Sequence, residues 1–250
     1  MKKTPSPASE SGSAVPTITA AKEVIRLTAG EWRPFISETM ENYGPFTQVV
    51  TEAFALEGVA VQYRFFPWKR AVRLAREGVW DGSIAIVHTQ ERETVFWYNT
   101  EPVMVGRRVF FHLKERPFDW SGIEDLAGLH IGATLEYYYG APFEMAEKTG
   151  RIRVDRVPTD LQNFGKILRG RVDIFPLTRE VGLYLLRTEF SPEEAARVTH
   201  HPLPLSAIPF YIILSRKVEK NERLLEAFNR GFRRLKESGR YDRIFWKWNF

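Results

Sequence analysis

The 250-residue chain contains no cysteine, which excludes a disulfide scaffold, thiolate metal sites and catalysis by a thiol. Long apolar runs are also absent, since the longest, residues 208–214, is far shorter than the ~20 residues of a membrane-spanning helix. The sequence has no glycine-rich phosphate or dinucleotide motif, no H-E-x-x-H and no G-x-S-x-G. Its five histidines are scattered. We therefore predict neither a metal site nor a cofactor.

Apolar and aromatic residues are plentiful. Hydrophobic residues make up 44% of the chain and aromatic residues 14%, which excludes a disordered or low-complexity chain. The formal net charge is +5 and the sequence pI is about 9.4, values that suit nucleic acid, an anionic membrane or an acidic ligand. A basic run in residues 230–243 is interleaved with apolar side chains, without a nucleic-acid-binding motif. We expect a solvated helix face there and no nucleic-acid partner.

The first 23 residues contain no predicted helix or strand. Met1-Lys2-Lys3 is typical of the start of an export signal, but residues 4–13 are rich in Pro, Ser and Glu where an apolar segment should follow. We interpret residues 1–23 as a flexible leader. Either the protein is cytoplasmic, or the chain begins after a removed export signal.

From residue 24 onward, short strands alternate with helices. In the first half we predict strands at 24–28, 59–65 and 84–87, with helices that begin at Pro45 and Pro67. In the second half we predict strands at 129–133, 152–157 and 172–175 and helices at 137–148, 161–168 and 180–187. Extended passages at 103–113 and 208–215 and final helices at 221–237 and 241–248 complete the pattern. This order predicts an α/β fold of two lobes with paired crossovers and a ligand cleft between them.

Two tryptophans and an arginine stand just after predicted strand ends, where open α/β sheets bind ligands. Trp32 follows the first strand, Trp68 lies at the start of the helix after the second, and Arg92 follows the third. Arg92 has the geometry to anchor an anion through two hydrogen bonds. Aromatic core packing is the alternative for the tryptophans, and a surface or hinge salt bridge is the alternative for the arginine.

Several short motifs keep a fixed order along the chain. In the first half they are Glu31-Trp32-Arg33-Pro34-Phe35, Gly44-Pro45-Phe46, Phe66-Pro67-Trp68-Lys69-Arg70-Ala71, Trp80-Asp81-Gly82, Thr89-Gln90-Glu91-Arg92 and Glu101-Pro102. In the second half they are Asp125-Leu126-Ala127-Gly128-Leu129-His130-Ile131-Gly132, Leu168-Arg169-Gly170-Arg171-Val172-Asp173 and Ile244-Phe245-Trp246-Lys247-Trp248. Together they resemble the family 3 extracellular solute-binding proteins, which serve polar amino acid ABC importers. The match runs from residue 24 to the end.

The resemblance implies a periplasmic-binding-protein-like fold of type II, in which two crossover strands join two lobes and hinge closure holds the ligand between them. It places lobe 1 in residues 24–106 and 207–250 and lobe 2 in residues 107–206. It also implies a small-molecule ligand, a permease of an ABC transporter as partner, and a monomer. The implied location is periplasmic or extracytoplasmic, and the implied function is binding without catalysis.

The same resemblance assigns roles to individual residues. Trp32 and Trp68 correspond to aromatic residues that flank the ligand side chain, and Arg92 corresponds to the arginine that holds its α-carboxylate. Thr178 stands eight residues after Gly170, where the family has an acidic residue that binds the α-ammonium group of an amino acid. Without that carboxylate, a buried ammonium would lack a charged partner.

Further candidates come from departures from the family pattern. Tyr137 and Tyr138 replace the small hydroxyl residues of a loop in lobe 2, and His88 is among the residues that replace serines before the Thr-x-x-Arg motif. With Arg33 and Arg70 nearby, the cleft would be aromatic and basic. We therefore predict a small organic acid as the ligand, with an atypical amino acid or peptide-like anion as the alternative. For the tyrosines, a helix face packed on its own lobe is the competing interpretation.

Two other classes of function stay open. Some proteins that resemble this family are dehydratases acting on cyclohexadienyl acids, and their chemistry needs an acid or base in the cleft. Glu136 and Glu180 are the carboxylates near the predicted loops. An extracytoplasmic sensor domain is the remaining class.

Overall fold

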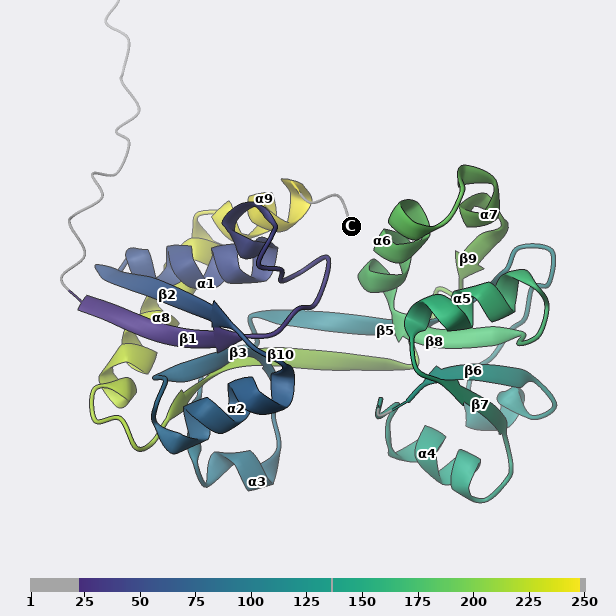
Figure 1. Cartoon of the computed structure of the whole chain (residues 1–250), viewed down its shortest axis with the longest axis horizontal. Coiled ribbons are helices and arrows are strands. Elements are labelled where there is room, and N and C mark those ends of the chain that lie inside the picture. The colour runs from purple at the N-terminus through teal and green to yellow at the C-terminus, as the bar shows by residue number, and fades with distance from the viewer. Residues whose placement is uncertain (1–22, 136, 248–250) are drawn as a thin grey trace, which may run out of the picture.

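The computed structural model describes residues 23–135 and 137–247, so that Glu136 and nearly all of the predicted leader lie outside them. Two α/β lobes stand side by side and are joined by two long strands (Figure 1). The two-lobed α/β architecture expected from the sequence is confirmed. No helix in the described part of the chain is long and apolar enough to cross a membrane.

The first lobe is built on three parallel strands. They are β1 (Glu23–Ala29), β2 (Val59–Phe65) and β3 (Gly82–Val87), in the order β2-β1-β3. α1 (Pro45–Ala55) begins with a proline, whose missing N–H is not needed in the first turn. α2 (Trp68–Glu77) follows Pro67 and stops at Gly78, which adopts the left-handed conformation that ends many helices. Figure 1 shows α1 and α2 on opposite faces of this sheet.

The C-terminal part of the chain returns to the first lobe as α8 (Asn221–Glu237) and α9 (Arg240–Lys247). The short elements α3 (Gln90–Glu93) and β4 (Phe96–Tyr98) also belong here. Much of the basic run predicted as a solvated face forms ion pairs. Arg230 and Arg234 both pair with Glu57, just after α1, and Arg240 pairs with Glu52 on α1.

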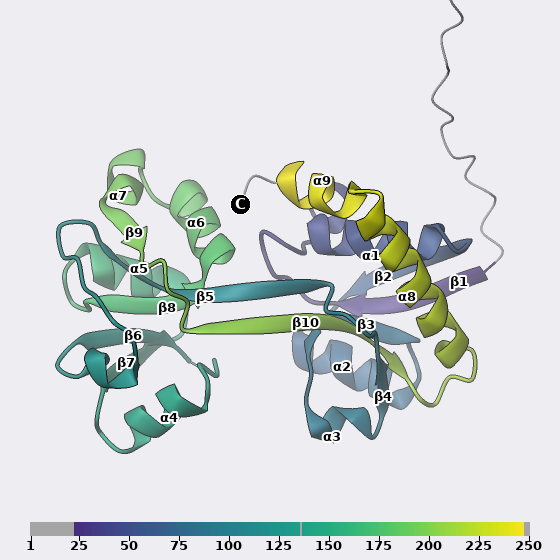
Figure 2. The same ribbon diagram turned by 180° about the vertical axis from the view of Figure 1, so that it is seen from behind.

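Two antiparallel strands, β5 (Met104–Leu113) and β10 (Ser206–Ser215), run next to each other from one lobe to the other (Figure 2). The first half of β5 pairs with β10, and the second half pairs with β8 of the second lobe. β10 in turn pairs with β3 of the first lobe. One sheet, in the order β2-β1-β3-β10-β5-β8-β6-β7, therefore continues through both lobes.

The second lobe repeats the alternation of strands and helices. Its strands are β6 (His130–Thr134), β7 (Arg153–Val157), β8 (Ile174–Thr178) and β9 (Val198–His200). Its helices are α4 (Ala141–Lys148), α5 (Asp160–Leu168), α6 (Arg179–Glu189) and α7 (Pro192–Arg197). Phe110 of β5 packs in a buried cluster with Trp120, Tyr139 and Phe143, whereas its neighbour Phe111 belongs to the larger cluster that also contains the core of the first lobe. The joining strand thus ties the two cores together.

The helix predicted at 137–148 begins later than expected. α4 starts at Ala141, after Gly140 with φ of 108° and next to Pro142 in the first turn. Residues 137–140 therefore form an irregular loop. The predicted start of this helix is therefore wrong. The difference matters for the site, because Tyr137 and Tyr138 lie on the loop and not on a helix face.

Candidate ligand cleft

The strand directions bring the loops of the two lobes toward each other. β5 runs from the first lobe into the second and pairs antiparallel with β8, so β8 ends facing the first lobe. β10 runs the opposite way and pairs antiparallel with β3, so β3 ends facing the second lobe. Strands β1 and β2 are parallel to β3, and β6 and β7 share the direction of β8. The carboxyl ends of both sheets, where open α/β sheets bind ligands, thus meet at one place.

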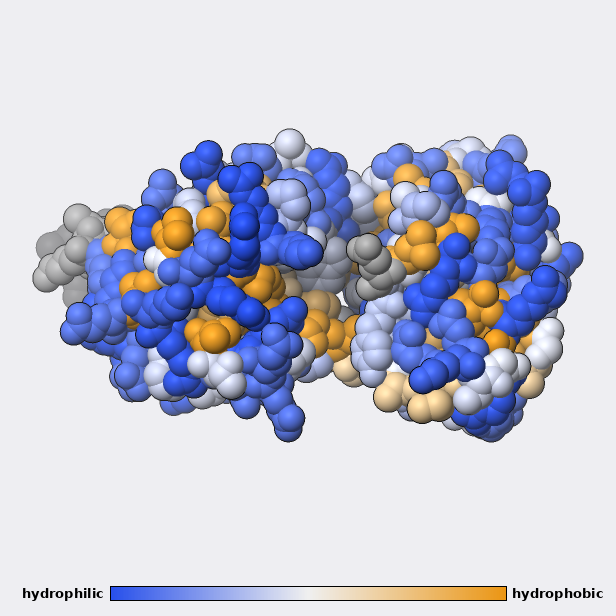
Figure 3. All heavy atoms as spheres, turned by 60° about the horizontal axis from the view of Figure 1, so that its bottom comes forward, coloured by the Kyte–Doolittle hydropathy of each residue, from blue (hydrophilic) through white to orange (hydrophobic). Residues whose placement is uncertain are grey.

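The molecule is hollowed at this place in the space-filling view, and apolar side chains gather where the lobes meet (Figure 3). Trp32 lies on the loop after β1 and is partly buried against the core. Its ring lies 4.7 Å from that of Phe35 and 4.5 Å from that of Phe210 on the joining strand β10, measured between centroids. A Cβ atom built at Gly106 of β5 would lie 3.0 Å from the Phe210 ring and 3.4 Å from the Thr178 methyl group. Gly106 therefore stands between the aromatic cluster around Trp32 and the end of β8.

Trp68 is fixed by the end of β1. A Cβ atom at Gly30 would lie 2.4 Å from the Trp68 ring, which means that only glycine leaves room for the indole. Core packing and ligand contact are compatible for both tryptophans, because each ring is half-buried.

The predicted arginines of the first lobe behave differently from one another. Arg33 reaches the second lobe, where its Nη1 donates to the Tyr184 hydroxyl of α6 at 3.4 Å, and its Nη2 donates to Thr39 at 2.6 Å. The hydrogen bond to Tyr184 raises the pKa of Arg33. Arg70 stacks over the ring of Phe66, with its guanidinium carbon 5.1 Å from the centroid. It is exposed there, and no hydrogen bond or ring contact joins it to the other predicted site residues within the described chain.

Arg92 and His88 lie together beyond the end of β3. Arg92 Nη1 donates to the carbonyl of Val87 at 2.9 Å, and the Thr89 side chain accepts from the Arg92 backbone N–H. His88 Nε2 lies 2.7 Å from a carboxylate oxygen of Glu93. Arg92 forms no ion pair with a described carboxylate. Its guanidinium also interacts with the Tyr98 hydroxyl, so that only the donors not used by Val87 and Tyr98 are left for an anion.

The second lobe contributes a network around the loop before α4. The Tyr137 hydroxyl lies 3.4 Å from Asp160 Oδ2, and Thr134 donates to the other carboxylate oxygen of Asp160 at 2.5 Å. Burial raises the pKa of both Asp160 and Tyr137 above their ordinary values. Tyr138 is 64% exposed, and Thr178 is buried at the end of β8. Glu180, considered above as a catalytic carboxylate, pairs with its neighbour Arg179 at 3.5 Å, whereas Glu136 is not among the described residues.

Sequence reasoning missed two members of this region, Arg108 and Asp160. Arg108 lies on β5 with only 9% exposure, donates from Nη1 to the Tyr138 carbonyl at 2.7 Å, and stacks 4.8 Å from the centroid of Tyr139. Burial lowers its pKa. The one signal was a charge at an alternating position of a mainly apolar extended passage, shared with its neighbour Arg107. Asp160 carried no signal, because an acidic residue in the first turn of a helix is common for structural reasons.

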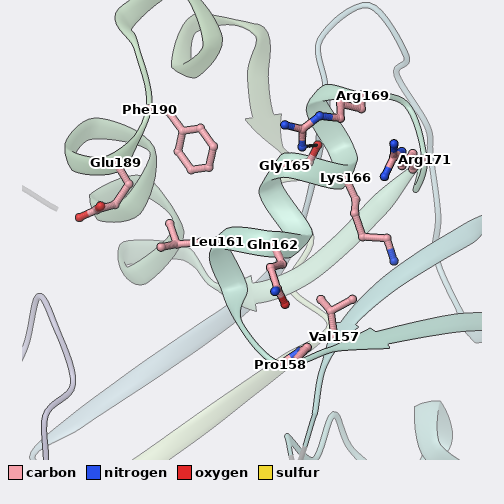
Figure 4. Close-up of a pocket in the computed structure, with 10 residues that line it drawn as sticks. All are labelled: Val157, Pro158, Leu161, Gln162, Gly165, Lys166, Arg169, Arg171, Glu189 and Phe190. Carbon is pink, nitrogen blue, oxygen red and sulfur yellow. Dashed lines mark hydrogen bonds between the residues drawn. The ribbon is translucent and has the colours of Figure 1, made fainter.

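A separate groove of about 680 Å³ lies along α5 and the end of α6 (Figure 4). Leu161 and Phe190 lie at one side, and Lys166, Arg169 and Arg171 at the other. None of the nine predicted site residues lines it. Among the described residues, no group of three or more acidic or histidine side chains is placed to hold a metal ion.

Residues 26–250 match the sequence profile of the bacterial extracellular solute-binding proteins, family 3. The chain belongs to this family. No curated protein matches it. As a family 3 member it shares the fold of solved structures at low sequence identity, so that the likeness establishes architecture and not ligand.

Three solved structures illustrate which kinds of protein share this fold. The probable amino-acid ABC transporter extracellular-binding protein ytmK from Bacillus subtilis superimposes with a TM-score of 0.76 at 16% identity, over 90% of this chain and 97% of that one. An ancestral arginine-binding protein bound to arginine gives 0.67 at 22% identity, over 91% and 98% of the two chains. A histidine kinase sensor domain with similarity to periplasmic binding proteins gives 0.67 at 19% identity, over 90% and 96%.

Proposed function

We propose that this family 3 protein binds a small organic acid between its two lobes and delivers it to the permease of an ABC importer. The observation that carries the proposal is the charge of the facing strand ends. Arg92 stands at the end of β3 without a carboxylate partner among the described residues, while β8 ends in Thr178, a neutral residue, next to the buried Arg108. Such a cleft suits an anion and offers no carboxylate at β8 for an α-ammonium group.

The remaining ligand-binding residues follow from the same arrangement. Trp32 and Trp68 offer half-buried aromatic surface from the first lobe, and the exposed Tyr137 and Tyr138 offer aromatic surface from the second. We assign Arg33 and His88 to the rim of the cleft. Arg70 is the weakest member of the predicted set, because its guanidinium is held against Phe66.

Lobe movement about β5 and β10 supplies the signal that a permease would detect. The proposed lobe boundaries, between residues 106 and 107 and between 206 and 207, fall on neighbouring positions of the two joining strands, where Arg107 pairs with Ala207. A hinge at these paired positions would bend both strands at the same point along their length. The proposed location is periplasmic or extracytoplasmic, and the proposed working unit is a monomer.

Ligand screening on the full chain tests the proposal. A panel of aliphatic and aromatic acids, with α-amino acids including arginine, would be screened by thermal shift and the hits measured by calorimetry. We expect organic acids without an α-ammonium group to raise the melting temperature, because a ligand that binds only the folded state stabilises it by mass action. A best ligand that is an ordinary α-amino acid would contradict the proposal. Turnover of cyclohexadienyl acids would favour an enzyme instead.

Arg92→Ala is the decisive variant for this function. We expect it to weaken binding of the best acid at least tenfold, about 1.4 kcal/mol or more, because a charge-assisted pair is lost. Arg73→Ala is the matched control, since Arg73 is exposed on α2 and outside the proposed site. Equal affinities of Arg92→Ala and Arg73→Ala for the acid would remove Arg92 from the site.

A further inference from the structure

Three polar residues occupy directly opposite positions on three neighbouring strands. Arg108 of β5 pairs with Thr178 of β8 on one side and with Ser206 of β10 on the other. Residues opposite each other in a sheet project from the same face. Gly106, two residues before Arg108 on the same face, places no side chain between this row and the ring of Phe210. The row therefore lies at the junction of the two lobes.

The hydrogen bonds of this row are incomplete. Arg108 Nε and the Ser206 hydroxyl are both buried without a partner among the described residues. Arg108 Nη1 donates to the Tyr138 carbonyl, but the described chain provides no acceptor for Nη2 and no carboxylate in ion-pair contact with the guanidinium. The Thr178 hydroxyl does not cap α6, the helix that it precedes. Buried cations and buried donors of this kind normally have partners.

The nearby acidic groups are already engaged. Asp160 accepts from Thr134 and Tyr137, and Glu144 pairs with Arg156 at 3.2 Å. The Arg108 guanidinium is held in place by the Tyr138 carbonyl and the face of the Tyr139 ring, which fix its plane. Asp160 and Glu144 attract it electrostatically but form no ion pair with it. A planar, oriented guanidinium with two hydroxyl groups beside it has the donor set that recognises a carboxylate.

We propose that Arg108, Ser206 and Thr178 form a second anion subsite, which binds the second acidic group of a dianionic ligand. This inference rests on the proposed function, in which Arg92 holds the first acidic group from the opposite lobe. A ligand with acidic groups at both ends would then bridge the lobes. Its two charges would hold the closed state together through β3 on one side and β5 on the other.

Calorimetry with a series of probes tests the subsite on the full chain. The probes are α,ω-dicarboxylates from malonate to suberate and terephthalate, each compared with the monocarboxylate of the same length or ring. We expect wild type to prefer a diacid of one length over its monoacid.

Arg108→Met keeps the apolar stem and removes the charge. It should weaken binding of that diacid at least tenfold while changing binding of the monoacid less than twofold. Arg108→Lys should recover part of the preference. Arg107→Met, an exposed neighbour on the opposite face of β5, should bind like wild type.

A second variant approaches the subsite from β8. Thr178→Asp puts a carboxylate opposite Arg108, where it can pair with the guanidinium. It should abolish the preference for the diacid without removing Arg108. The inference is overturned if acids bind wild type but Arg108→Met loses the diacid and the monoacid equally, or loses neither. Failure of every acid to bind wild type would overturn the proposed function as well, so the two failures are distinguishable.

Discussion

Among single residues, Asp160 has the environment with the clearest consequence for pH. Its carboxylate lies in the second lobe under the loop of Tyr137, and burial raises its pKa although two hydroxyl groups donate to it. A carboxyl whose pKa is higher in the folded protein than in the unfolded chain binds its proton more tightly when folded. Ionisation of Asp160 therefore costs stability at neutral pH, and this cost disappears as the pH falls to the ordinary range of aspartate, about 4.

Asp160→Asn tests this reasoning, since the amide oxygen can still accept from Thr134. We expect the variant to exceed wild type at pH 7 by on the order of 1 kcal/mol in the free energy of unfolding, with the difference shrinking toward pH 4. Urea denaturation at a series of pH values gives the comparison. Glu226→Gln, an exposed site on α8, controls for the loss of one surface charge. A wild type that is the more stable protein at pH 7 would show that the hydroxyl groups outweigh burial.

The same residue scale shows where sequence reasoning stops. The aromatic positions Trp32 and Trp68 were predicted because they follow strand ends, a relation that depends only on chain order. Arg108 was missed because nothing in a strand pattern says that a charged position will be covered. Its burial comes from Tyr138 and Tyr139, a segment 30 residues further along the chain that approaches only in three dimensions.

Among the elements, β1, β3 and α8 are held together by one buried carboxylate, Asp81. The side chain is 2% exposed and accepts from the Arg26 backbone N–H at 2.7 Å. It also pairs with the side chains of Arg26 and Lys220, at 3.5 and 3.2 Å. Asp81→Ala leaves these donors without their acceptor, and we expect it to cost about 3 kcal/mol in the free energy of unfolding. Urea denaturation monitored by tryptophan fluorescence measures the loss.

The control for Asp81 is an ion pair that joins the same elements at the surface. Arg223 of α8 pairs with Glu23 of β1, and its side chain is 62% exposed. Because exposed pairs contribute little, Arg223→Ala should change stability by less than about 1 kcal/mol. Similar losses for the two variants would mean that burial of Asp81 does not set its contribution.

Most elements could be predicted from periodicity and from prolines and glycines at their ends. The start of α4 could not, because the apolar spacing of Tyr137 to Tyr139 continues into the helix while Gly140 takes a positive φ. The local sequence pattern predicts a helix at these residues, whereas the backbone conformation of Gly140 prevents one. The short helix α3 was also missed, since its four residues are too few to show a period.

At the scale of the whole molecule, the Arg33–Tyr184 hydrogen bond joins the loop after β1 to α6 of the second lobe. The bond is 3.4 Å long and exposed. It therefore stabilises the lobe arrangement in which it forms by at most about 1 kcal/mol. That amount still changes the ratio of two lobe arrangements about fivefold, and apparent affinity scales with the fraction of the protein that is competent to bind.

Tyr184→Phe removes the hydroxyl and keeps the ring. We expect it to enlarge the radius of gyration of the free protein and to weaken acid binding about two- to fivefold. Small-angle scattering and calorimetry measure the two effects. Thr188→Val, one turn later on α6, should change neither, because among the described residues the Thr188 hydroxyl bonds only to Tyr184 and Glu189 of the same helix. If Tyr184→Phe altered affinity but not the radius, the tyrosine would act on the ligand directly and not through lobe closure.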